Sequence, residues 1–159
     1  MKKILSIICV LAVMLSFAAC GNKQNGTDIE ISTEETVNVL ENDKNIEIKV
    51  FDVVDNKEVI KKIEIENKDG VAIANAVLNE IKATNTTFNY VNIVDNKVYI
   101  DFTENSGVLH SGTAGELAVL DSLGMTFVEM LGYDNIYFSV EGEAYESGHI
   151  ALDKDEPYM

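Results

Sequence analysis

The stretch Phe88-Asn-Tyr-Val-Asn-Ile-Val-Asp-Asn-Lys-Val-Tyr-Ile-Asp-Phe-Thr103 decides the fold of this chain. Apolar residues occupy every second position in its second half, a pattern typical of a strand with one buried face. The central Asp-Asn pair suits a tight turn, because both residues tolerate a positive φ better than most. We therefore predict a β-hairpin over residues 88–103.

A second hairpin is predicted upstream. Residues 46–50 (Ile-Glu-Ile-Lys-Val) alternate between apolar and polar side chains, and the alternation returns in the later half of residues 59–66. The tetrapeptide Val-Asp-Asn-Lys forms the turn in both hairpins, at residues 54–57 and 94–97. Four shared residues are too few to indicate an internal duplication, since common turn chemistry explains them.

Each hairpin leads into a segment with helical spacing. Residues 71–83 carry one apolar stripe, and residues 117–131 carry a longer one. Thr113-Ala-Gly-Glu116, before the second helix, is the pattern of a capping box, and Gly132 suits the helix end. Gly124 inside this helix costs about 1 kcal/mol relative to alanine, so we expect a close approach of the helix to the sheet there.

Residues 135–141 (Asn-Ile-Tyr-Phe-Ser-Val-Glu) form one more predicted strand, with a turn at Gly142. The element order ββαββαβ defines an α+β protein, and we expect a small mixed β-sheet with two helices packed on one face. Residues 46–159 have the length of a single domain of ordinary size. The arrangement of residues 46–66 in the sheet is left open.

The first 19 residues have the three parts of a secretory signal. Two lysines precede an apolar run over residues 4–17, and small residues precede Cys20. The run is shorter than the roughly 20 residues that a membrane-spanning helix needs. Phe-Ala-Ala-Cys at residues 17–20 resembles the lipobox of bacterial lipoproteins, in which the cysteine receives the lipid. Cys20 is the predicted lipidation site, and an ordinary secreted protein is the alternative.

Residues 20–45 read as the lipidated cysteine followed by a disordered acidic tether, because they are polar and contain few aromatics. The whole chain has a net charge of −15, and removing residues 1–19 takes away two lysines and no acid, which leaves −17. A surface this acidic repels nucleic acid, so we expect no nucleic-acid partner. Cys9 leaves with the signal, and Cys20 alone cannot form an intramolecular disulfide.

Five pieces of the chain's second half follow one another in an order and spacing that resemble the GerMN domain, an extracytoplasmic module of sporulation and germination proteins and related lipoproteins. The first half matches less closely, since no Gly-Pro follows the first helix and Pro157 is the chain's one proline. The matching pieces are residues 91–102, residues 111–116, the helix with Thr126 and Glu129, residues 136–142, and residues 148–152.

The resemblance implies a fold similar to ring-building modules that assemble secretion-type channels around spores. The family has no established catalytic residues, so the implied role is non-enzymatic binding or assembly in the cell envelope, in sporulation or germination. The expected location is the outer face of the cytoplasmic membrane. Expected partners are the membrane, through the N-terminal lipid, and an envelope or spore-coat protein or a cell-wall ligand; homo-oligomerisation is left open.

The candidate segment for binding a ligand or partner is Ser111-Gly-Thr-Ala-Gly-Glu116. Helix N-termini present free N–H groups to anions, and Ser111, Gly112, Thr113, Gly115 and Glu116 would surround such a site. The competing interpretation is a capping box with glycines for the turn. The strongly negative charge of the chain favours this second interpretation.

Two further interpretations remain. A hydrolase acting on the wall or on spore material would use His110 or His149, but catalysis needs a nucleophile, a base and an orienting acid that meet in space. No Gly-x-Ser-x-Gly pattern is present, and we expect no catalytic residue. A small-ligand-binding lipoprotein would need a preformed apolar pocket.

No metal or other cofactor is expected. Asp95 with Asp101 form one acidic cluster, and Asp153, Asp155 and Glu156 form another. Neither cluster has the spacing of a calcium-binding loop.

Overall fold

The computed structural model describes residues 44–159. The predicted signal peptide (1–19), the lipidation site Cys20 and nearly all of the predicted tether (20–45) lie outside the described residues.

The element order confirms the predicted α+β class and the succession ββαββαβ. A strand of two residues follows at the end, a 3₁₀ helix (η1) precedes the second helix, and a π-helical segment (η2) continues it. In chain order the elements are β1 (Asn45–Asp52), β2 (Lys57–Glu64), α1 (Gly70–Glu80), β3 (Phe88–Val94), β4 (Lys97–Phe102), η1 (Gly107–His110), α2 (Gly112–Gly124), η2 (Met125–Met130), β5 (Asn135–Val140) and β6 (Glu143–Ala144).

The strands form two sheets, whereas the sequence led us to expect one. β1 and β2 pair with each other, antiparallel, from Asn45 opposite Glu64 to Asp52 opposite Lys57. The second sheet has the order β3-β4-β5-β6, in which β4 and β5 are parallel and the other neighbours are antiparallel. The second sheet is therefore mixed, as predicted, and the first hairpin forms a separate layer.

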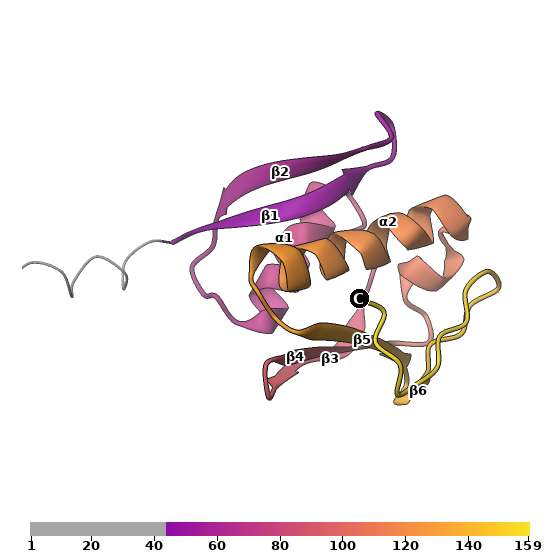
Figure 1. Ribbon diagram of the computed structural model, residues 1–159. Coiled ribbons are helices and arrows are strands. Elements are labelled where there is room, and N and C mark those ends of the chain that lie inside the picture. The colour runs from indigo at the N-terminus through magenta and orange to yellow at the C-terminus, as the bar shows by residue number, and fades with distance from the viewer. Residues whose placement is uncertain (1–43) are drawn as a thin grey trace, which may run out of the picture. The chain divides into compact units, whose positions relative to one another are not determined.

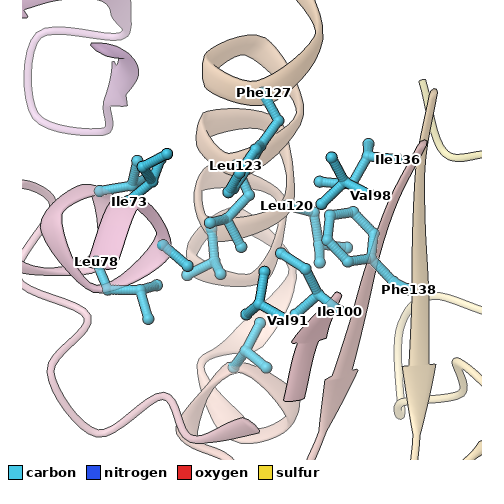
Figure 2. Packing of buried hydrophobic residues seen from close by; sticks show 14 of the residues in the cluster. Ile73, Leu78, Val91, Val98, Ile100, Leu120, Leu123, Phe127, Ile136 and Phe138 are labelled. Carbon is cyan, nitrogen blue, oxygen red and sulfur yellow. The ribbon is translucent and has the colours of Figure 1, made fainter. Parts of the chain in front are cut away.

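Helix α2 lies between the β1–β2 hairpin and the four-stranded sheet (Figure 1). Figure 2 shows Leu120, Leu123 and Phe127 of α2 and η2 beside Ile136 and Phe138 of β5, and all five side chains are buried. Full burial of one such side chain contributes about 1.5–3 kcal/mol. This contact joins the second helix to one face of the sheet, as the apolar stripe predicted.

The same core continues to the hairpin and to α1. Ile46, Ile48 and Val50 of β1 are buried with Ile73 and Val77 of α1. An isolated two-stranded hairpin is at best marginally stable in water. The hairpin therefore depends on the helices that cover its inner face.

The unpaired edge of β1 is bound by side chains of the second helix. Lys49 N–H donates to Thr126 Oγ1 at 3.1 Å, and the Thr126 hydroxyl donates to the Lys49 carbonyl at 2.9 Å. Phe51 N–H donates to Ser122 Oγ at 2.9 Å. Ser122 and Thr126 are four residues apart and fully buried, so they occupy one helix face. The edge where β1 would join another strand already has partners, which explains the separate sheet.

The Lys49 side chain adds ion pairs to this contact. Its Nζ lies 2.8 Å from Glu129 Oε2 and 2.5 Å from Glu58 Oε2. The hydrogen bonds to Glu129 and Glu58 raise the pKa of Lys49 above its ordinary value. Thr126 and Glu129, two residues that carried the family resemblance, therefore both hold the helix against β1.

Gly124 lies against the C-terminal residues rather than against the sheet. A Cβ added at Gly124 would lie 3.2 Å from Met159 Cε and 3.3 Å from its Sδ. Ile136 N–H donates to the Met159 carbonyl, and Tyr158 N–H donates to the Ile136 carbonyl, at 3.1 and 2.8 Å. The expected close approach at Gly124 is present, but the neighbour is the segment that pairs with β5.

The predicted turn chemistry is confirmed. Asn56 in the first hairpin turn has φ 49°, and Asp95 and Asn96 in the second have φ 48° and 60°. Gly132, the predicted residue after the helix, has φ 78°. These are left-handed conformations that glycine, asparagine and aspartate adopt at low cost.

Candidate functional site

A cavity of about 500 Å³ lies at the turn end of the β1–β2 hairpin. Its walls come from the hairpin, the end of α1, the loop that follows α1, η1 and the first turns of α2. Pockets that bind small molecules commonly have volumes of about 300–1,000 Å³. The cavity is therefore large enough for a small molecule or for an anchoring side chain of a partner.

The lining of the cavity is largely apolar. Val50 and Val59 of the hairpin, Val108 of η1, and Ala118 and Val119 of α2 contribute to it. Burial of apolar surface contributes about 25 cal/mol per Å², so the cavity favours an apolar group.

One buried hydroxyl in this lining has no hydrogen-bond partner. Thr86 is 7 % exposed, and within residues 44–159 no group pairs with its Oγ1. A buried polar group without a partner costs about 1–3 kcal/mol. The oxygen itself is closed to solvent, so an occupant of the cavity does not reach it in this structure.

The three carboxylates at the rim of the cavity each have a donor. Asp52 accepts two backbone N–H groups of the hairpin turn, at 2.9 and 3.1 Å. These bonds, the one from Asp55 first, hold the pKa of Asp52 below its ordinary value. Asp55 pairs with Lys57 at 2.7 Å, and Glu80 pairs with Lys61 at 2.7 Å.

The structure brings two of the five candidate binding residues to the cavity. Ser111 and Gly115 are part of the lining, whereas Gly112, Thr113 and Glu116 are not. Gly112 has φ 71°, which only glycine adopts without strain, and it turns the chain from η1 into α2. Thr113 is exposed at the start of the helix.

The predicted capping box is wrong. Among residues 44–159 no side chain caps the N-terminus of α2, and Ser111 rather than Thr113 holds the N-cap position. The Ser111 hydroxyl donates to the Val108 carbonyl at 2.8 Å. Glu116 cannot reach back to the helix start, because it points into the core and accepts a hydrogen bond from Tyr145.

Glu116 and Tyr145 form a buried pair. Both side chains are 0 % exposed, and the Tyr145 hydroxyl donates to Glu116 Oε1 at 2.7 Å. Glu116 Oε2 has no partner in the described part of the chain. Burial, and then the hydrogen bond to Glu116, raises the pKa of Tyr145. Glu116 therefore belongs to the protein core and not to the wall of the cavity.

We expect this burial to make the protein sensitive to alkaline pH. The pKa values of Tyr145 and Tyr158 are both raised by burial and then by hydrogen bonds to Glu116 and Asp121. Tyrosine in the unfolded chain ionises near pH 10. Above this pH the unfolded state loses protons that the folded state keeps, so the free energy of unfolding falls by about 1.4 kcal/mol per pH unit for each tyrosine. Urea unfolding between pH 7 and 12 measures this slope, and Tyr158→Phe should reduce it. An unchanged slope in that variant would contradict the assignment.

Both histidines are exposed, and neither side chain has a hydrogen bond or ion pair among the residues that the structure describes. Ser111 donates to a backbone carbonyl, as described above. Ser147 Oγ accepts a hydrogen bond from the backbone N–H of His149 at 3.0 Å, and no hydrogen bond joins it to the His149 ring within residues 44–159. The described region therefore contains no serine paired with His110 or His149.

Within residues 44–159, no group of three or more His, Cys, Asp or Glu side chains is placed to hold a metal ion.

Asp101, from one of the predicted acidic clusters, is 2 % exposed. It accepts hydrogen bonds from the side chains of Asn89 and Ser139 and from Gly142 N–H, at 2.6–2.8 Å. These bonds join three neighbouring strands and a turn, which is a structural role.

Sequence reasoning missed the part of the cavity wall that comes from the hairpin and from the loop after α1. Residues 83–87 (Ala-Thr-Asn-Thr-Thr) occupy the place after the first helix where the family pattern has a Gly-Pro. Thr86 lies in this run. Neither its burial nor its missing partner has a signal in the sequence, because both depend on how distant segments pack.

Residues 24–146 match the model of the family Germane, described as sporulation and spore germination, which confirms the resemblance to the GerMN domain. The match covers more than half of the chain. No curated protein and no solved structure matches the chain. None of the described helices is both long and apolar enough to cross a membrane.

Proposed function

Because the chain belongs to the Germane family of sporulation and spore germination proteins, we propose that it is a lipid-anchored, extracytoplasmic module with a non-enzymatic binding role in the cell envelope. Cys20 carries the lipid, and the folded domain stands outside the cytoplasmic membrane. Its partner is an envelope or spore-coat protein or a cell-wall ligand.

The observation that carries the binding role is the cavity beside the hairpin. Its lining is largely apolar, and each carboxylate at its rim already accepts a hydrogen bond or pairs with a lysine. Such a cavity can bury an apolar group of a partner, which is a common basis of recognition. Hydrolysis would need a nucleophile and a base in contact, and the described lining holds no such pair.

The hairpin turn beside the cavity gives the partner a place to dock. Val53 and Val54 line the cavity and are 50 % and 93 % exposed. Apolar side chains inside a rim of charged residues are the usual anatomy of a protein interface. The partner would cover the turn and place an apolar group in the cavity.

Photo-crosslinking tests this docking. A photoreactive residue at position 54 should give a discrete adduct in sporulating or germinating cells. The same residue at position 60 is the control, because Ile60 is 59 % exposed on the same hairpin but does not line the cavity. Equal labelling from both positions, or none from position 54, would count against docking at this site.

Replacing Cys20 with alanine should release the protein from membranes. One lipidated cysteine is the whole anchor in this proposal, and stable anchoring needs two or more acyl chains on it. We expect most of the protein to move from the membrane fraction to the soluble fraction after a high-salt wash. Cys9→Ala is the matched control and should remain with the membranes, since Cys9 leaves with the signal. Retention of the Cys20→Ala protein through the wash would contradict a lipid anchor at Cys20.

A second candidate function is small-ligand binding, and the preformed apolar cavity is the observation that favours it. The hydrolase that would use His110 or His149 has no comparable observation in its favour. The same cavity is the binding site in both the protein-docking and the small-ligand form of the proposal.

A further inference from the structure

The four-stranded sheet has an outer face, turned away from α2, that no described helix covers (Figure 1). Residues directly opposite each other on neighbouring strands point to the same side, so the register of β3, β4 and β5 places three rows of side chains on this face. The rows run across the sheet from β3 to β5. The middle row is Asn92, Tyr99 and Tyr137, and the row beside it is Tyr90, Asp101 and Ser139.

The outer face carries almost no exposed charge, although the chain has a net charge of −15. Asp101 is the one acid in the three rows, and its carboxylate is 2 % exposed and already accepts three hydrogen bonds. Lys97, in the third row between Val94 and Asn135, is the one base. An uncharged face of an acidic protein complements an uncharged ligand.

The outer face of the β1–β2 hairpin provides an internal comparison. Solvated sheet faces are commonly polar, and this one carries exposed charged side chains on both strands. They include Glu47, Glu58 and Lys62. The tyrosines and asparagines of the four-stranded sheet are therefore a local feature that solvation of a sheet face does not explain.

Three tyrosines supply the aromatic surface of the outer face. Tyr99 and Tyr137, on neighbouring strands, stack with ring centroids 4.9 Å apart and an angle of 11° between their planes. Tyr90 is 39 % exposed. The hydroxyl groups of these three residues have no hydrogen-bond partner within residues 44–159. Tyrosine combines an apolar ring with a polar tip, which suits a ligand whose own surface is both apolar and polar.

Two asparagines lie beside the tyrosines. Asn92 is exposed and Asn135 is half-buried, and neither side-chain amide has a hydrogen bond in the part of the chain that the structure describes. An amide group offers two donors and an acceptor oxygen. The outer face therefore presents free donors and acceptors next to aromatic rings, which is the combination that a hydroxyl-rich ligand needs.

We propose that the outer face of the four-stranded sheet binds an uncharged segment of a glycan strand. A sugar ring has a face of C–H groups that packs on an aromatic ring, and a rim of hydroxyl or acetamido groups that donate and accept hydrogen bonds. The acetamido groups of N-acetylated sugars match the amides of Asn92 and Asn135. Tyr90 and Tyr137 lie two strand spacings apart, about 10 Å, which is wider than one sugar ring, so the ligand is an oligosaccharide.

A single-stranded nucleic acid would also stack on aromatic rings, but its phosphates need a positively charged groove, and this face has one lysine. The glycan proposal rests on the exported location in the proposed function. It names the chemistry of the cell-wall ligand and places it on a surface separate from the cavity.

Two tetrasaccharides of different charge test the ligand class. Tetra-N-acetylchitotetraose, which is uncharged, and tetragalacturonate, which is anionic, are titrated into the exported chain carrying Cys20→Ala. Calorimetry gives the dissociation constants, and backbone amide NMR shifts locate the site. We expect the uncharged tetrasaccharide to bind at millimolar concentration or below, at least tenfold more tightly than tetragalacturonate, and to shift the amides of residues 90–99 and 135–139. No binding of the uncharged tetrasaccharide, equal binding of tetragalacturonate, or shifts confined to the hairpin turn would overturn the proposal.

Single substitutions on the outer face test its residues. Tyr90→Ala should weaken binding of the uncharged tetrasaccharide about three- to tenfold, which is the range of one aromatic contact. Asn92→Ala should also weaken it, whereas Asn75→Ala is the matched control, since Asn75 is exposed on α1 and its side chain has no hydrogen bond within residues 44–159. Lys97→Gln should leave binding unchanged, because the ligand carries no charge.

The midpoint of thermal unfolding is measured for each variant, so that a loss of binding is compared only among folded proteins. An equal loss in Asn92→Ala and Asn75→Ala would contradict the contact at Asn92. A loss of binding in Lys97→Gln would show that the ligand is bound through charge and would overturn the uncharged glycan.

The outcome is separable from that of the lipid-anchored docking role. Saccharide binding is measured on the purified, lipid-free chain, whereas crosslinking from position 54 and membrane release of Cys20→Ala are measured in cells. If position 54 crosslinks to a protein and the uncharged tetrasaccharide does not bind, the glycan inference fails alone. If the tetrasaccharide binds and position 54 gives no adduct, docking at the cavity fails and the glycan site stands. A discrete protein adduct from a photoreactive residue at position 92, without saccharide binding, would assign the outer face to a protein partner and overturn the proposal.

Discussion

Replacing Thr126 with valine is expected to lower the free energy of unfolding by about 2–6 kcal/mol. The Thr126 hydroxyl accepts from Lys49 N–H and donates to the Lys49 carbonyl, and the side chain is 0 % exposed. Valine keeps the shape and removes both bonds, so two backbone groups of β1 lose their partner at about 1–3 kcal/mol each. The loss is large because these bonds tie the hairpin to the helix.

Urea unfolding of the Cys20→Ala chain and of its Thr126→Val derivative measures this loss. Thr84→Val is the matched control, since Thr84 is exposed and its side chain has no hydrogen bond within the described region. Such a surface substitution should stay within about 0.5 kcal/mol. Ser122→Ala removes the single bond to Phe51 N–H and should cost less than Thr126→Val. A cost below 0.5 kcal/mol for Thr126→Val would show that β1 does not depend on this edge contact.

Tyr145→Phe is the second substitution with a large expected effect, about 2–4 kcal/mol of unfolding free energy. It removes the only hydrogen bond that the buried Glu116 carboxyl has among residues 44–159. Removing one member of a buried polar pair exposes the other to the full cost of its desolvation. The aromatic contact with Phe102, at 5.9 Å between ring centroids, is retained in the variant.

A double-mutant cycle separates the lost partner from lost packing. Glu116→Met in the Tyr145→Phe background should recover most of the stability, because two apolar side chains of similar volume then face each other. Tyr90→Phe is the control tyrosine: Tyr90 is 39 % exposed and its hydroxyl has no partner in the described part of the chain. Failure of Glu116→Met to rescue Tyr145→Phe would mean that Tyr145 matters for packing and not for Glu116.

The contact between Glu116 and Tyr145 shows which part of the candidate site could not be predicted from the sequence. The segment of residues 111–116 was recognised as a helix start, and two of its residues do line the cavity. Glu116 was placed at the helix start because the spacing Thr-x-x-Glu is the local signature of a capping box. The side chain turned inward instead, because Tyr145, 29 positions along the chain, offers a hydroxyl in the core. No local pattern carries that information.

The sequence by itself determined the element order, both Asp-Asn turns, the glycine that ends the second helix and the apolar faces of the hairpin at residues 88–103. These are local properties: alternation, helical spacing and the tolerance of a positive φ act within a few residues. Only the tertiary structure decided that the first hairpin forms its own sheet, because Ser122 and Thr126 occupy the edge of β1 from more than 70 positions away. The cavity is likewise a tertiary product, since its lining comes from five segments that meet only after the helices have packed between the two sheets.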